Sequence, residues 1–598
     1  MPIEVHADEW FMTAGLIGFV RLLGQDQVTM TKHGIELNSK DIQNLSTRYI
    51  HKLIEEFSVV RRDVKRMNWY LEQMKKKPEN TKAYVAEIRK QISEQFKKVD
   101  KYFSDSEECG LMSQILDQLK EVGSSEDQEK VRRAVQDYEQ LASTPMINEK
   151  LTLNYAKAII LNPFYGQTSI LQPVFNSKSI EEHIQQIEKD FVRPAYLELL
   201  LYERINTSPD QHPIIQFLTD HQEEYKPFKD WLKKLKKCTS IDEIRLYFQE
   251  ELLPCSFLDE LTATQSYEEM VFSPLALSKS KAVNFHWEFD HKLPVPMSAV
   301  ARLIMFLVPF GVTFYTRKRG TPTSSENIRF AGIVISQQSF KSILKENNYY
   351  KHLRGQDLSF GEAIVGLFQE SKDKAERIQH AYQFVEVYSD YQMKKTLLDY
   401  YHMPPYLVHY FSKYGNALTL LLHYDFRDSF IRSILQGVDP KQTLFQYLRE
   451  AVKNEFHGAG AYHASRERRR IIDAREDVNQ MGSYDKQIGF IYYCGVELRE
   501  SMVKKRPGLE EEGPYRASGR KKLEGIAYRL INAVKAGNKK EFMDTIFRLY
   551  MSANQEVPRI FIDIFKEEGL DFETIASSFI AGMLGNEKSK KEEEAAHG

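Results

Sequence analysis

Cysteine is scarce in this sequence, and no two cysteines form a CxxC pair. The chain of 598 residues contains four, which stand far apart at Cys109, Cys238, Cys255 and Cys494. This spacing argues against a disulfide framework and against a complete four-thiolate zinc site, and it is typical of a reducing compartment. We predict a cytoplasmic protein without a metal site, and because the sequence contains no cofactor signature we predict no cofactor.

A large net charge and a long apolar run are also missing. The formal charge is −2, so any anion binding must come from local basic clusters. The apolar run at residues 303–312 holds ten residues, whereas a membrane span needs about 20. The run at residues 14–23 follows acidic residues and not the basic segment that opens a secretory signal. Both runs predict buried core.

Signatures of catalysis are equally sparse. The sequence contains no GxxxxGK[ST] phosphate loop and no GxSxG nucleophile elbow. His286, Asp290 and His291 could ligate a metal, because imidazole and carboxylate suit zinc, manganese or iron. Further ligands at a suitable spacing do not stand out, and we favour the simpler interpretation, in which they are partly buried polar side chains in a turn. We predict no catalytic residue and keep a metal-dependent nuclease as an alternative.

Helical periodicity dominates what the sequence does contain. Apolar residues recur at helical spacing through most of residues 41–140 and 179–253, and helices are expected to prevail from 340 to 455. Residues 329–336 (RFAGIVIS) are typical of a strand. The expected fold class is mainly α with a minor β component (α+β).

A glycine-containing segment, HGAGAY at residues 457–462, predicts a domain boundary. It separates a large N-terminal domain (1–456) from a C-terminal helical bundle (463–585). The charged residues 586–598 predict a disordered tail.

Basic residues gather in clusters that can neutralise phosphates independently of base sequence. The three clusters are Arg61, Arg62, Lys65 and Arg66 on one helical face; Arg466, Arg469 and Arg470; and Lys504, Lys505 and Arg506. The alternative is a solvated helix face with internal ion pairs, which Glu467 and Asp473 could supply. Because several clusters occur together, we favour nucleic-acid binding.

An amide-rich loop at residues 161–177 (LNPFYGQTSILQPVFNS) has side chains suited to reading base edges. Asn162 and Gln167 can both donate and accept hydrogen bonds, and Phe164 and Tyr165 could stack or wedge between bases. The alternative is a loop whose amides satisfy its own backbone. We predict that Asn162, Phe164, Tyr165, Gln167 and Lys178 read a short DNA motif.

Four stretches follow one another in the order found in a known family. They are DEWFMTAGLIGFVRLLG (8–24), FSPLALSKSKAVNFHWEF (272–289), LPVPMSAVARLIMFLVPFG (293–311) and GIAYRLINAVKAGNKKEFMDTIFRLYMSANQEVPRIF (525–561). The set resembles the large subunit of type I-B CRISPR–Cas effector (Cascade) complexes, the Cas-eight-b family, Cst subtype. The resemblance runs from about residue 8 to residue 585.

The resemblance implies a non-enzymatic subunit of an RNA-guided antiviral complex. Such a subunit sits at the crRNA 5′ end, reads the protospacer-adjacent motif in duplex DNA, helps to unwind it and stabilises the R-loop. Its partners would be crRNA, target double-stranded DNA, the other Cascade subunits and a helicase–nuclease, with no membrane involved. Base pairing reads the sequence in such complexes, while protein reads a short motif and backbone shape. A helical scaffold that binds only proteins is a further alternative.

One departure from the family concerns zinc. Members of this subtype commonly carry two CxxC pairs flanking the second stretch, as a four-thiolate site requires. Here a lone Cys255 stands before it, and LPVP at residues 293–296 stands where the second pair would be. We therefore expect a degenerate zinc-finger-like insert, at about residues 255–330, that is held by apolar packing.

Overall fold

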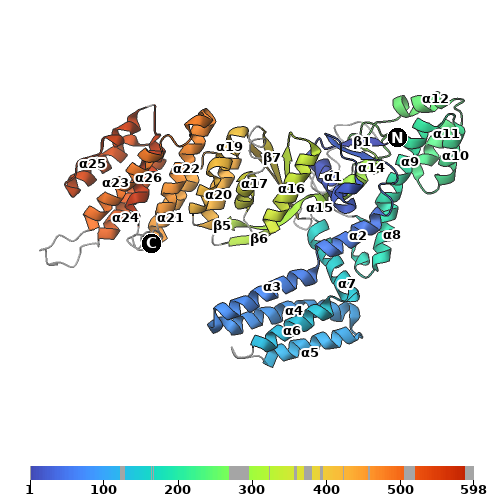
Figure 1. The fold of residues 1–598 in the computed structure, drawn as a ribbon, viewed down its shortest axis with the longest axis horizontal. Helices are drawn as coiled ribbons and strands as arrows, with labels where there is room; N and C mark the ends of the chain where they lie inside the picture. The colour runs from blue at the N-terminus through green and yellow to red at the C-terminus, as the bar shows by residue number, and fades with distance from the viewer. Residues whose placement is uncertain are drawn as a thin grey trace.

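The computed structural model describes residues 2–121, 128–162, 164–165, 168–267, 295–321, 324–355, 360–369, 380–390, 395–421, 423–454, 458–503, 519–566 and 568–585. Over these residues the chain is mainly helical, with one four-stranded antiparallel sheet and two two-stranded ones, so the predicted fold class is confirmed. The molecule is elongated, with the four-stranded sheet near its middle (Figure 1). None of the helices described has both the length and the apolarity that a membrane crossing requires.

The apolar runs of the sequence form the central body. Helix α1 (Trp10–Leu23) lies against α14 (Ala299–Phe306) and α15 (Val308–Gly311), and nearly all the residues of these three helices are buried. The backbones meet closely, because a Cβ at Gly311 would lie 1.7 Å from the carbonyl oxygen of Ala14. Phe306 stacks on Phe191 and on Tyr49, with ring centroids 4.0 and 4.5 Å away. The prediction of buried core is confirmed.

The four-stranded sheet joins this body to the C-terminal helices. Its strands run in the order β5 (Thr313–Thr321), β6 (Ser324–Ser336), β7 (Tyr382–Asp390) and β8 (Lys395–Met403). Val385 faces the central body and Phe384 faces the C-terminal helices. The strand predicted at residues 329–336 is confirmed as part of β6. Helices prevail in the described part of residues 340–455, as expected, but the strands β7 and β8 within it were not predicted. Both faces of β7 pack against apolar cores, which leaves little polar alternation.

The C-terminal helices share one apolar core with the sheet. Helix α22 (Ala459–Glu476) packs against α19 (Pro405–Tyr414) on one side and α26 (Phe572–Met583) on the other. This core extends from Tyr315 to Met583. The apolar packing therefore continues across the boundary predicted at residues 457–462. The tail predicted at 586–598 lies outside the described residues.

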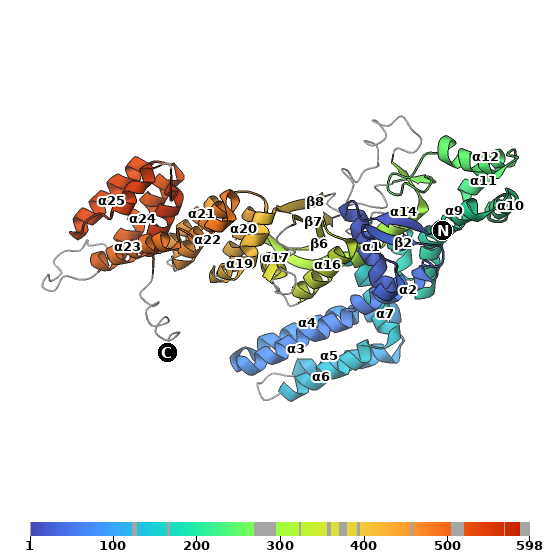
Figure 2. The ribbon, with the colours of Figure 1, turned by 45° about the horizontal axis from the view of Figure 1, so that its top comes forward.

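A separate four-helix unit, here called the arm, projects from the central body (Figures 1 and 2). It consists of α3 (Val59–Lys76), α4 (Thr81–Phe103), α5 (Glu107–Glu121) and α6 (Gln128–Ala142), and it has its own core. Helices α2 (Leu45–Glu56) and α7 (Pro145–Ala156) connect it to the body.

The end of the molecule away from the C-terminal helices carries a second small unit, here called the α9–α12 lobe (Figure 1). It contains α9 (Arg193–Thr207), α10 (His212–His221), α11 (Lys226–Leu235), α12 (Ile241–Leu246) and a π-helical turn, η8 (Tyr247–Glu251). The remaining larger elements are β1 (Ile3–His6), β2 (Gly34–Leu37), α8 (Ile180–Ile187), α16 (Phe340–Gly355), α17 (Phe360–Gln369), α20 (Tyr424–Leu435), α21 (Lys441–Asn454), α23 (Asp485–Val503), α24 (Gly519–Lys535) and α25 (Lys539–Ala553).

Candidate nucleic-acid interface

The arm separates charge between its two helical hairpins. From Val59 to Phe103, which spans α3 and α4, the sequence has thirteen lysines and arginines and six acidic residues, a formal charge of +7 in a chain of net charge −2. Helices α5 and α6 contain seven acidic and four basic residues. All thirteen basic residues are exposed: Arg61, Arg62, Lys65, Arg66, Lys75, Lys76, Lys77, Lys82, Arg89, Lys90, Lys97, Lys98 and Lys101.

The predicted cluster on α3 forms a stripe along the helix surface. The opposite face of α3 buries residues such as Val60, Val64 and Met67 in the arm core, so its helical period turns the basic residues outward. Trp69 follows Lys65 by four positions, on the same side of α3, and 54% of its surface is exposed. An exposed tryptophan beside basic residues is the combination that stacks on unpaired bases.

The α4 lysines and Trp69 were missed in the sequence, although the charge was visible there. A count over the whole chain hides the charge of the α3–α4 hairpin because acidic residues elsewhere cancel it. A count over each predicted helical hairpin would have found it.

Arg62 is held at the base of the stripe by a buried carboxylate. Its Nε and Nη2 donate to Oδ1 of Asp63 at 3.0 and 2.7 Å. The other oxygen of Asp63 accepts from Gln95 of α4 at 2.9 Å. The position of Arg62 therefore depends on the packing between α3 and α4.

The same guanidinium reaches the neighbouring elements of the body. It lies over the ring of Tyr155 in α7, and Nη1 of Arg329 in β6 donates to the Tyr155 hydroxyl at 2.5 Å. Burial by itself raises the pKa of Tyr155, but the two arginines lower it by more, so the net pKa is lowered. The arm and the sheet thus meet at a cationic joint built on one phenol.

The second basic cluster is not a surface. Arg469 and Arg470 are buried in α22, where Arg469 pairs with Asp473 at 2.7 Å. Arg470 donates to Glu467, which is fully buried, at 2.9 Å and to Asp485 at 2.5 Å. Nε of Arg466 donates to the same Glu467 at 3.0 Å. The prediction that these arginines hold a nucleic-acid backbone is wrong for Arg469 and Arg470, and the alternative of internal ion pairs through Glu467 and Asp473 is confirmed.

The third cluster, Lys504, Lys505 and Arg506, lies outside the described residues. So do His286, Asp290 and His291, the residues of the nuclease alternative. In the ranges that the structure describes, no three His, Cys, Asp or Glu side chains are grouped as a metal site would require.

The amide-rich loop places its aromatic residues inside the protein. Phe164 and Tyr165 are fully buried, and the Tyr165 hydroxyl donates to the carbonyl oxygen of Phe306 in α14. Their predicted role as a stacking or wedging pair is therefore wrong, because their rings are part of the central core. Gln167 lies outside the described residues. Asn162 is half-buried, and Lys178 pairs with Glu182 at 2.6 Å.

The expected zinc-finger-like insert is only partly described, because residues 268–294 are outside the structure's description. Cys255 is buried in the central core, and its Sγ accepts from the backbone N–H of Ser298 at 3.2 Å. Residues 296–330 continue into β4 (Pro296–Met297), α14, α15 and the first two strands of the sheet.

Comparisons with family models, with curated proteins and with solved structures found no match to this chain.

Proposed function

We propose that the chain is a non-catalytic, nucleic-acid-binding subunit of an RNA-guided antiviral complex, corresponding to the large subunit of type I-B Cascade. The proposal is supported most by the exposed basic side of the arm, which carries a formal charge of +7 over α3 and α4. The four ordered sequence stretches that resemble the Cas-eight-b family supply the kind of assembly. The proposed location is the cytoplasm, and the proposed partners are crRNA, target DNA, the other Cascade subunits and the helicase–nuclease.

The arm would bind the sugar-phosphate backbone. Lysines and arginines that neutralise phosphates release condensed counterions, so affinity does not depend on base sequence and falls steeply with salt. Trp69 offers a ring on which a base of an opened strand can stack. This division fits a subunit that helps to keep a duplex open while guide RNA reads the sequence.

Recognition of a short motif is the less supported part of the proposal. Since Phe164 and Tyr165 are core residues, the loop retains Asn162, Gln167 and Lys178 as proposed contacts. Loss of motif-dependent binding in an Asn162→Ala/Gln167→Ala variant would support a motif-reading role for the loop. Unchanged motif preference in this variant would contradict that role.

The test uses electrophoretic shift of target duplex by the reconstituted complex at two salt concentrations. A triple variant, Arg61→Ala/Lys65→Ala/Arg66→Ala, should bind at least tenfold more weakly for all sequences. The plot of log affinity against log salt should become less steep, with the magnitude of its slope reduced by about 3. The matched control is Lys226→Ala/Lys236→Ala/Lys237→Ala, which removes the same charge from exposed positions of the α9–α12 lobe.

Equal loss in the triple variant and its control would contradict a specific role for the arm. If the unsubstituted complex fails to shift duplex DNA at either salt concentration, the result would contradict the proposal and favour the alternative of a helical scaffold that binds only proteins.

A further inference from the structure

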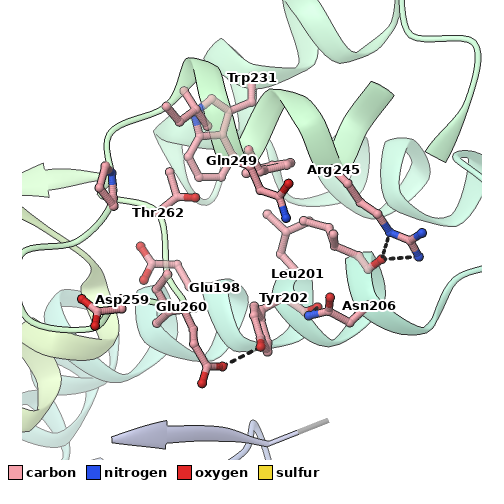
Figure 3. Close-up of a pocket in the computed structure, with 15 residues that line it drawn as sticks. Glu198, Leu201, Tyr202, Asn206, Trp231, Arg245, Gln249, Asp259, Glu260 and Thr262 are labelled. Carbon is pink, nitrogen blue, oxygen red and sulfur yellow. Dashed lines mark hydrogen bonds between the residues drawn. The ribbon is translucent and has the colours of Figure 1, made fainter. Parts of the chain in front are cut away.

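The α9–α12 lobe contains a cavity that the proposed function does not use. It has a volume of about 280 Å³ and lies between α9, the turn η8 and the segment at residues 254–262. Figure 3 shows its lining residues. The apolar part of the wall consists of Leu201, Ile205, Trp231, Phe248, Leu252 and Leu261. Most of the rest of the lining is polar or charged, so the cavity combines an apolar wall with groups that can orient a ligand.

The basic residue at this cavity is already engaged. Arg245 donates from Nε and Nη2 to the carbonyl oxygen of Ile205, both at 3.2 Å, and its Nη1 lies 3.3 Å from a carboxylate oxygen of Asp242. Its hydrogen-bonding capacity is therefore largely used within the lobe, and its charge is partly offset.

The acidic side of the cavity has no such compensation. Figure 3 shows Asp259 and Glu260 on one side and Arg245 on the other. Glu260 accepts a hydrogen bond from the neutral Tyr202 hydroxyl at 2.6 Å. Within the described part of the chain, neither Asp259 nor Glu260 forms an ion pair with lysine, arginine or histidine.

A third carboxylate lines the cavity from inside. Glu198 is buried, and it accepts from Tyr225 at 2.6 Å, from Thr264 at 2.5 Å and from the backbone N–H of Ala299 at 2.7 Å. With its hydrogen-bonding positions occupied, Glu198 contributes negative potential without offering a free ligand atom. The cavity thus joins an apolar, aromatic wall to an uncompensated negative rim.

We propose that this cavity binds the side chain of a lysine in a protein partner. The apolar stem would pack against Leu201 and the Trp231 ring, and the ammonium group would reach Asp259 and Glu260. Lysine combines such a stem with a charged head, and the same ammonium is attracted to an aromatic face. The negative rim disfavours a polyanion, so this site is separate from the nucleic-acid contacts proposed for the arm.

The experiment compares two capped amino acids that differ in the charged group. The probes are Nα-acetyl-lysine methylamide and Nα-acetyl-norleucine methylamide, added to the full chain labelled with 5-fluorotryptophan. The ¹⁹F resonance of Trp231, assigned with Trp231→Phe, reports occupancy. We expect a saturable shift with the lysine probe and at least tenfold weaker binding of the norleucine probe.

Variants locate the binding. Asp259→Asn/Glu260→Gln keeps an acceptor for Tyr202 and should weaken the lysine probe at least tenfold while leaving the norleucine probe unchanged. Asp242→Asn, which removes a carboxylate beside Arg245 that does not line the cavity, should leave both unchanged. Free n-hexylamine binding more tightly than the capped lysine would assign the cavity to small amines and overturn a protein side chain as its ligand. Equal binding of the two capped probes, no saturable shift, or an unaffected double variant would overturn the site itself.

Discussion

The guanidinium of Arg62 lies 4.4 Å from the centroid of the Tyr155 ring, and the hydroxyl of the same tyrosine accepts from Arg329. One phenol therefore contacts a cation from the arm through its face and a cation from the sheet through its oxygen. This arrangement links the position of the basic stripe to the body of the protein.

Tyr155→Phe should loosen that joint while keeping the ring. Arg329 loses a charged hydrogen bond, which is worth about 1.5–3 kcal/mol, so amides of α7 and β6 should exchange hydrogen at least tenfold faster. Hydrogen exchange measured by mass spectrometry checks this. Tyr84→Phe, in a ring that packs against Tyr70 within the arm, is the matched control. Equal exchange in both variants would show that the hydroxyl does not secure the joint.

Trp69→Ala should separate single-stranded from duplex binding. Stacking of one base on an aromatic ring is worth about 1–3 kcal/mol, so affinity for single-stranded DNA should fall while affinity for duplex changes little. Fluorescence anisotropy with both DNA forms measures the two affinities. Trp69→Phe, which keeps an aromatic face, should restore most of the loss, and an equal loss for both DNA forms would count against stacking.

Arg470→Ala should lower the stability of the protein, whereas Arg61→Ala should weaken DNA binding. Removing Arg470 leaves the fully buried Glu467 without one of its cationic partners, which should cost about 3–5 kcal/mol of unfolding free energy. Arg61 is exposed, so its loss should change stability by less than about 0.5 kcal/mol and should weaken DNA binding. Urea unfolding and electrophoretic shift distinguish the two. A stable Arg470→Ala variant with weakened DNA binding would instead show that α22 takes part in DNA binding.

Glu198 should make the stability of the α9–α12 lobe depend on pH. Burial raises its pKa from an ordinary value of 4.5 to about 6, so the folded state holds the proton more tightly than the unfolded state. Its contribution to stability is therefore fully present below pH 4.5 and is lost as the pH rises through 6, by at most about 2 kcal/mol. Unfolding followed by Trp231 fluorescence from pH 4 to 7 should show this loss. Glu198→Gln should abolish it, and an unchanged pH dependence in that variant would contradict the prediction.

Gly311→Ala should destabilise the central body. The added Cβ would meet the carbonyl oxygen of Ala14 at 1.7 Å, and separating α15 from α1 should cost about 3 kcal/mol. Gly110→Ala in α5, where a Cβ would meet nothing within 4 Å, should instead stabilise its helix by about 0.5–1 kcal/mol. Thermal unfolding of both variants tests the pair, and similar melting temperatures would show that the backbones can separate at little cost.

Sequence periodicity predicted the helices and the α3 stripe because both depend on local spacing. Arg61 and Lys65 fall on one side of any helix that contains them. Burial by distant residues could not be read in the same way. Arg470 and Arg61 belong to similar basic runs, but Arg470 is buried and pairs with Asp485 of another helix in addition to Glu467 of its own. Phe164 and Tyr165 have the residue types of a reading loop, but their place is set by packing against α14. Strand β7 was missed because both of its faces are buried, with Phe384 on one side and Val385 on the other. Strand β8 at the sheet edge, which leaves Tyr400 exposed, was not recognised either.

The opposite charges of the two hairpins in the arm have a consequence for approach and not only for contact. A body that is positive along one flank and negative along the other has an electric dipole across its short axis. In the field of a polyanion it experiences a torque, so the α3–α4 flank would turn toward that polyanion before the surfaces touch. The α5–α6 flank is repelled, which keeps the arm from being wrapped on both sides and leaves that flank facing outward.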